Sequence, residues 1–137
     1  MKTRFELITK IIARELGIDV KLNLLLLEDD PIFSTKLKSF LKNDELTIVP
    51  SGSEALELIS KNIYDFVIID FYLTNMTGTD FVTLAETYGY VFPYIYVTSS
   101  PREVSVNGCC FGVIDKAEFS IEDLSQVIYN RINNFNI

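Results

Sequence analysis

The sequence predicts an α/β domain in which a parallel sheet carries helices on both faces. Short apolar segments alternate five times with segments of helical periodicity, a pattern typical of parallel strands joined by helical crossovers. The apolar segments are nearly continuous, as strands buried on both faces require. The chain has 137 residues, 48% of them hydrophobic, which suits one compact domain that buries about two-thirds of its surface on folding.

An amphipathic helix is expected over residues 4–16, and Gly17 would end it. Its apolar face would consist of Phe5, Ile8, Ile11, Ile12 and Leu16. A helix of this length is marginal in water by itself, so this face should pack on something. Three alternatives stay open: packing on its own domain, a homodimer mediated by the helix, or a chain that is a fragment of a larger protein.

The remaining elements follow in order along the chain. Strands are expected over residues 22–27, 46–49, 66–69, 94–97 and 111–114. Helices are expected after Asp30 and Ser53 as N-caps, from Gly78, and after Ser120 as N-cap. The segment after the fourth strand leaves room for one or two helical turns only, with Ser100 as cap, Pro101 at N1, Glu103 in a capping box and Gly108 at the end.

Composition excludes several classes of function. The net charge of −7 and the sequence pI of about 4.5 argue against nucleic acid or an anionic membrane as partner. No apolar run reaches the roughly 18 residues of a membrane span, and no secretory signal is recognisable. The absence of histidine removes His-based zinc sites, Ser-His-Asp triads and a histidine phosphodonor. The adjacent Cys109 and Cys110 suit a reducing cytoplasm, the expected location.

Polar side chains follow four of the five expected strands. They are Glu28, Asp29 and Asp30 after the first strand, Asp70 after the third, Thr98 at the end of the fourth and Lys116 after the fifth. The carboxyl ends of parallel strands meet at one edge of the sheet, where α/β proteins place their sites. Crowded carboxylates repel one another, and a hard divalent cation with oxygen ligands relieves this, Mg²⁺ more readily than Ca²⁺ when few carboxylates are available. An acidic turn can also be a solvated helix cap, which is the expected role of Asp30.

In these residues the sequence resembles the receiver domain of two-component response regulators. The motifs are Glu28-Asp29, "DFYLTNMTG" from Asp70 to Gly78, "YVTS" with Thr98, and Lys116. The resemblance covers roughly residues 21–137 and leaves residues 1–20 as an N-terminal helical extension. It implies a flavodoxin-like, doubly wound five-stranded sheet in the order 2-1-3-4-5.

The resemblance also implies the site. Asp70 would be the phosphoacceptor, Lys116 would pair with it and then with the phosphoryl oxygens, and Thr98 would donate a hydrogen bond to the phosphoryl group. Mg²⁺ or Mn²⁺ would be bound by Asp29, Asp70 and the backbone carbonyl of Tyr72, with Glu28 acting through water.

Tyr72 and Ser100 stand where the family tunes dephosphorylation, and a bulky Tyr72 predicts slow autodephosphorylation. Three positions depart from the family pattern: Thr74 and Ala117 replace common prolines, and Val113 replaces an aromatic residue.

The expected function is therefore a signalling module and not an enzyme. It would accept a phosphoryl group from a sensor histidine kinase or a histidine phosphotransfer protein and act on a downstream protein, with no attached output domain. One alternative is a pseudo-receiver that binds a partner without being phosphorylated. Another is a phosphatase of the haloacid dehalogenase kind. Tyr72 argues against it, because such an enzyme needs an aspartate as general acid at this position.

Overall fold

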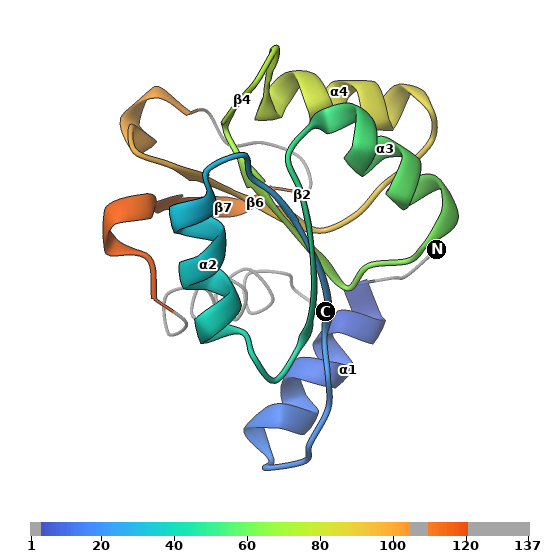
Figure 1. Ribbon diagram of the computed structural model, residues 1–137. Helices are drawn as coiled ribbons and strands as arrows, with labels where there is room; N and C mark the ends of the chain where they lie inside the picture. The colour runs from blue at the N-terminus through green and yellow to red at the C-terminus, as the bar shows by residue number, and fades with distance from the viewer. Residues whose placement is uncertain (1–3, 105–109, 121–137) are drawn as a thin grey trace.

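The computed structural model describes residues 4–104 and 110–120. Its centre is a parallel sheet of five strands in the order β2-β1-β3-β6-β7, with helices on both faces (Figure 1). The strands are β1 (Asn23–Leu27), β2 (Glu45–Val49), β3 (Phe66–Asp70), β6 (Tyr94–Thr98) and β7 (Cys110–Asp115). The predicted fold class and strand order are confirmed.

Four α-helices and two 3₁₀ helices accompany the sheet in the described part of the chain. They are α1 (Arg4–Glu15), α2 (Pro31–Phe40), α3 (Gly52–Lys61), α4 (Gly78–Thr87), η1 (Pro101–Glu103) and η2 (Lys116–Glu118). A small antiparallel hairpin, β4 (Tyr72–Leu73) with β5 (Met76–Thr77), follows β3 and was not expected from the sequence. The helix expected after Ser120 lies outside the described residues.

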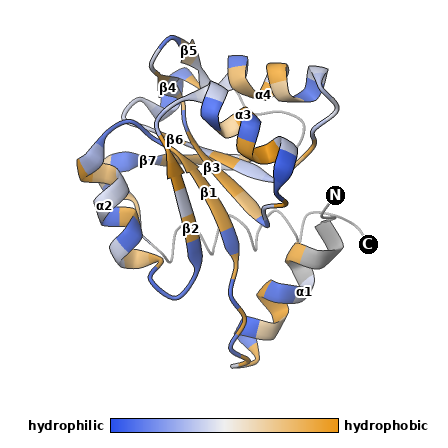
Figure 2. Cartoon of the chain, turned by 45° about the vertical axis from the view of Figure 1, so that its right-hand side comes forward, coloured by the Kyte–Doolittle hydropathy of each residue, from blue (hydrophilic) through white to orange (hydrophobic). Residues whose placement is uncertain are grey.

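The leucine-rich strand β1 shows why these strands are apolar throughout. Leu24 and Leu26 lie in the core on the side of α1 and α2, whereas Leu25 and Leu27 lie in the core on the side of α3 and α4. Successive side chains of a strand point to opposite faces, so a strand covered on both sides needs an apolar residue at every position. Figure 2 shows this concentration of hydrophobic residues in the central strands.

The helix N-termini agree with the sequence at α2 and differ from it at α3. The Asp30 side chain accepts a hydrogen bond from the backbone N of Ile32, as expected of an N-cap. Helix α3 is capped by Ser51 and not by Ser53, because the Ser51 Oγ accepts from the backbone N of Glu54. The helix therefore begins at Gly52. A Cβ atom at this position would come within 2.5 Å of the Met76 Sδ, so a larger residue would require Met76 to move.

The N-terminal helix α1 packs against the domain that follows it. Leu7 is 2% exposed and belongs to the core cluster on the α2 side of the sheet. The Lys10 Nζ lies 2.7 Å from the Asp65 Oδ2, and the Arg14 Nη1 lies 3.1 Å from the Asp44 Oδ1. Gly17 ends the helix with a φ of +79°, in the left-handed region that favours glycine.

The segment after β6 begins a helical turn at Pro101, as expected. Among the described residues of this segment, 99–104, the helical element is the 3₁₀ turn η1, and Ser100 makes no side-chain capping bond to it. The expected capping box is absent because the Glu103 carboxylate instead accepts a hydrogen bond from the Tyr72 hydroxyl. Gly108, the expected end of this helix, and Cys109 lie outside the described residues. Within the described ranges, no helix is long and apolar enough to cross a membrane.

Candidate functional site

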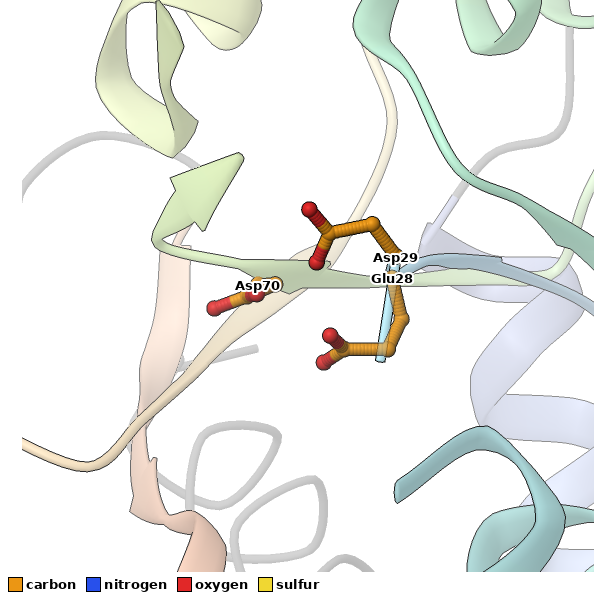
Figure 3. Close-up of side chains that lie close together, drawn as sticks. All are labelled: Glu28, Asp29 and Asp70. Carbon is orange, nitrogen blue, oxygen red and sulfur yellow. The ribbon is translucent and has the colours of Figure 1, made fainter. Parts of the chain in front are cut away.

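The carboxyl ends of β1, β3, β6 and β7 bring the predicted polar residues together at one edge of the sheet. Glu28, Asp70 and Thr98 are 3%, 4% and 1% exposed, whereas Asp29 is exposed to solvent. The side chains of Glu28 and Asp29 extend from opposite sides of the backbone after β1, and both carboxyl groups point toward Asp70 at the end of β3 (Figure 3). The site therefore has a buried floor and one carboxylate that water reaches.

Lys116 supplies the positive charge of the site. Its Nζ lies 2.7 Å from the Glu28 Oε2 and 3.1 Å from the Asp70 Oδ2. The resemblance predicted the contact with Asp70, whereas the shorter contact with Glu28 is a finding of the structure. Asp115 holds the backbone around Lys116 in place, because its Oδ1 accepts from the backbone N of Ala117, 2.9 Å away.

Burial and pairing change the acidity of these groups. Burial raises the pKa of Glu28 to about 7, although its hydrogen bonds to Lys116 and to the backbone N of Asp30 act in the opposite direction. Burial lowers the pKa of Lys116, but the hydrogen bond to Glu28 and the charges of Asp70 and Glu28 outweigh it and leave that pKa raised. Lys116 is therefore held as an ammonium in a site that has an excess of acidic groups.

This excess of carboxylates suits a divalent cation. Glu28, Asp29 and Asp70 each offer one carboxylate oxygen, and these atoms lie within 4.8 Å of one another. Opposite ligands of an octahedral Mg²⁺ ion are about 4.2 Å apart, from Mg–O bonds of roughly 2.1 Å, so small side-chain rotations bring the oxygens to bonding distance. All three are hard oxygen donors, and the exposure of Asp29 lets water complete the octahedron. The residues present fit Mg²⁺ or Mn²⁺.

Thr98 lies at the carboxyl end of β6 with its side chain buried. Its Oγ1 accepts a hydrogen bond from the backbone N of Ser100, 3.1 Å away. Bonding of this kind to the local backbone was the alternative to a site role. Accepting that bond still leaves the hydroxyl proton of Thr98 for donation, so both roles are compatible.

The hairpin β4–β5 connects the neighbouring strand ends to each other. The backbone N of Tyr72 donates to the Asp70 Oδ1 at 3.2 Å, and the Tyr72 hydroxyl reaches Glu103 on η1. The Thr74 Oγ1 donates to the Asp29 Oδ2 at 2.6 Å. The hairpin thus contacts residues from the ends of β1, β3 and β6.

Sequence reasoning missed three contributors to the site. The family pattern presents Thr74 only as a replacement for proline, although its hydroxyl group indicates that it can form a hydrogen bond. Glu103 was assigned to a helix cap. Phe33, whose ring lies beside Lys116, looked like any apolar helix residue, and nothing in the sequence distinguishes it from the other core aromatics.

Comparison with known proteins identifies the family. The family model described as the response regulator receiver domain matches residues 24–126, so the chain belongs to the response regulator receiver domain family. The match begins within β1 and leaves α1 outside it. A receiver is a signalling module, and the phosphatase alternative is therefore rejected.

Solved structures agree with this fold. A CheY-like response regulator receiver domain from Methylobacillus flagellatus is 20% identical, with a TM-score of 0.68 over 82% of this chain and 99% of that chain. The receiver domain of the Francisella response regulator 1452 is 24% identical, with a TM-score of 0.67 over 82% and 99% of the two chains. A signal receiver domain of an HD domain-containing protein from Pseudomonas fluorescens Pf-5 is 16% identical, with a TM-score of 0.69 over 83% and 96%. No curated protein matches the chain.

Proposed function

We propose that this receiver accepts a phosphoryl group on Asp70 from a phosphohistidine of a sensor histidine kinase or a histidine phosphotransfer protein. The observation that carries the proposal is the placement of the buried Asp70 carboxylate, 3.1 Å from the Lys116 ammonium and grouped with two further carboxylates. A cation-binding acidic cluster and a fixed ammonium around one carboxylate are what phosphoryl transfer requires, because the reaction depends on positioning and charge neutralisation.

The chemical step follows from these positions. A carboxylate oxygen of Asp70 attacks the phosphorus and forms a P–O bond, while the P–N bond to the donor imidazole breaks. The electron pair of that bond goes to the imidazole nitrogen, which solvent protonates. Lys116 then pairs with the phosphoryl oxygens, and the Thr98 hydroxyl donates a hydrogen bond to one of them.

Asp29, Asp70 and the backbone carbonyl of Tyr72 would hold Mg²⁺ or Mn²⁺, with Glu28 acting through water. When bound, the ion supplies positive charge beside the phosphoryl oxygens. Asp29 is suited to this role because it is exposed to solvent and oriented by Thr74.

The side chain of Tyr72 supports slow autodephosphorylation. It is 49% exposed two residues after Asp70, and its hydroxyl donates to Glu103 on η1, so the position of the ring is restricted. Restricted in this way, the ring would obstruct an attacking water, while Ser100 occupies the second tuning position. We expect a phosphoryl lifetime of minutes or longer in wild type and a shorter one in Tyr72→Gly, while a lifetime of seconds in wild type would contradict this role.

A pseudo-receiver remains the second candidate. The observation in its favour is Val113 of β7, which pairs with Tyr96 of β6 and stands at a position that commonly holds an aromatic residue in the family. In that case the domain would act as an unphosphorylated interaction module.

The deciding experiment is intact-mass spectrometry after incubation with acetyl phosphate, with and without Mg²⁺. Wild type should gain one Mg²⁺-dependent phosphoryl group, and Asp70→Asn should gain none. Asp19→Asn is the matched control, because Asp19 is exposed and lies outside the acidic cluster, and it should be labelled like wild type. A folded wild type without any adduct would favour the pseudo-receiver.

A further inference from the structure

Lys116 has a third neighbour besides Glu28 and Asp70. Its Nζ lies over the ring of Phe33, 5.1 Å from the ring centroid. The face of an aromatic ring carries partial negative charge and attracts a cation within about 6 Å. Phe33 belongs to α2 and is 5% exposed, so the contact is shielded from water, where such an attraction is strongest.

The ring of Phe33 is itself held in place. Phe119 packs against it edge to face, with centroids 5.6 Å apart and an interplanar angle of 85°. Phe119 is 3% exposed and directly follows η2, the turn that begins with Lys116. The two aromatic residues thus connect α2 to the short segment that carries the ammonium.

An aromatic contact suits this position for an electrostatic reason. The ammonium has to stay near Asp70 and yet remain able to pair with a doubly charged phosphoryl group. A carboxylate such as Glu28 attracts the ammonium but also repels phosphoryl oxygens, whereas a ring attracts the ammonium without adding a formal charge. The Asp115 cap fixes the backbone at Lys116, but the flexible four-carbon side chain beyond it can be positioned only by the groups that it contacts.

We propose that Phe33 is a positioning residue, which holds the Lys116 ammonium through its ring face so that Lys116 can neutralise the phosphoryl group on Asp70. The proposal rests on the proposed phosphorylation of Asp70. It assigns to Phe33 a role in the rate of phosphoryl acceptance beyond its place in the core.

The kinetic test changes the electrostatics of the ring and keeps its shape. Pentafluorophenylalanine, incorporated at position 33, has an aromatic ring of similar size with a reversed quadrupole. The matched control is the same replacement of Phe111, a 7% exposed residue of the same core cluster that packs edge to face on Phe66. The rate of acetyl phosphate labelling at saturating Mg²⁺ should fall about three- to tenfold for position 33 and stay near wild type for position 111.

A spectroscopic test is independent of the reaction. Protons above an aromatic face resonate upfield, so the Lys116 Hε signals should be shifted upfield in wild type. Phe33→Leu should remove this shift and Phe111→Leu should keep it, with both variants checked for folding by thermal unfolding.

The outcomes separate the two proposals. Equal labelling rates for the two fluorinated proteins, or Hε signals unaffected by Phe33→Leu, would overturn the role of Phe33 alone. If the wild type is never labelled, the proposed phosphoacceptor function is overturned. The role of Phe33 in phosphoryl acceptance is then overturned as well.

Discussion

At the scale of single residues, Asp29 is the member of the acidic cluster that depends most on a neighbour. Its side chain is exposed, so packing does not restrict its rotation. Restriction comes from the 2.6 Å hydrogen bond that Thr74 donates to its Oδ2, which leaves the other oxygen for a cation. Outer partners that orient a ligand in this way commonly contribute to metal affinity.

Replacing Thr74 with valine should therefore weaken Mg²⁺ binding. Valine keeps the shape of threonine and removes the donor, so Asp29 gains rotational freedom. We expect the Mg²⁺ dissociation constant, measured by isothermal titration calorimetry, to rise about three- to tenfold. This is a small effect for a residue that orients a metal ligand, because the hydrogen bond is exposed to water. Thr74→Ser should restore tight binding. Thr87→Val, in an exposed position of α4, is the control, and equal affinities for all four proteins would show that Thr74 does not orient Asp29.

At the scale of elements, α1 acts as part of the domain although it lies outside the family match. Its Lys10 contacts Asp65, which is 1% exposed and also accepts from the backbone N of Asn23 at 2.7 Å. The helix thus ties together the starts of β1 and β3, at the edge of the sheet opposite the acidic cluster. Its contribution to stability should come mainly from Leu7, since burial of apolar area is the largest favourable term.

Truncation of Leu7 tests this packing. Leu7→Ala should lower the free energy of unfolding by about 2–5 kcal/mol, as for other fully buried leucines. Leu16→Ala is the matched control, because Leu16 is 73% exposed, and it should change the stability by less than about 0.5 kcal/mol. Urea unfolding at two protein concentrations checks both. If α1 instead stabilised a homodimer, the midpoint of wild type would rise with protein concentration, and Leu7→Ala would weaken that dependence.

At the scale of the whole molecule, the negative charge of the acidic cluster should make the stability of the fold depend on cation binding. The chain carries a net charge of −7, and two of the three carboxylates in its acidic cluster pair with the ammonium of Lys116. A ligand that binds only the folded state stabilises it by mass action. A divalent cation that binds this cluster should therefore stabilise the fold beyond the general screening of charge.

Mg²⁺ should raise the melting temperature of the protein, and the gain in stability should grow with the logarithm of the Mg²⁺ concentration above the dissociation constant. At 100 times the dissociation constant the expected gain is about 2.7 kcal/mol. Differential scanning calorimetry should show this gain for wild type and a much smaller one for Asp29→Asn. NaCl at matched ionic strength is the control for screening. Equal gains for the two salts would show that the acidic cluster binds no divalent ion under these conditions.

The sequence was a reliable guide wherever the signal is local. The continuous apolar segments predicted all five strands, and Asp30 before Pro31 predicted the start of α2. The order of polar residues at the strand ends predicted that Glu28, Asp70, Thr98 and Lys116 would converge. It was less reliable where two local solutions compete, as at Ser51 and Ser53, because either serine can cap a helix and the local sequence does not distinguish them.

Residue order alone thus establishes the fold class, the edge of the sheet that carries the site and the chemical types gathered there. These follow from short-range rules, since burial on both faces demands apolar strands and parallel strands end at one edge. The shorter pairing of Lys116 with Glu28, the ring of Phe33 beside the ammonium and the bond from Thr74 to Asp29 depend on packing between elements that are distant in sequence. These contacts depend on how α2, η2 and the β4–β5 hairpin pack on the sheet, because a small displacement of one of these elements would give its side chains different partners.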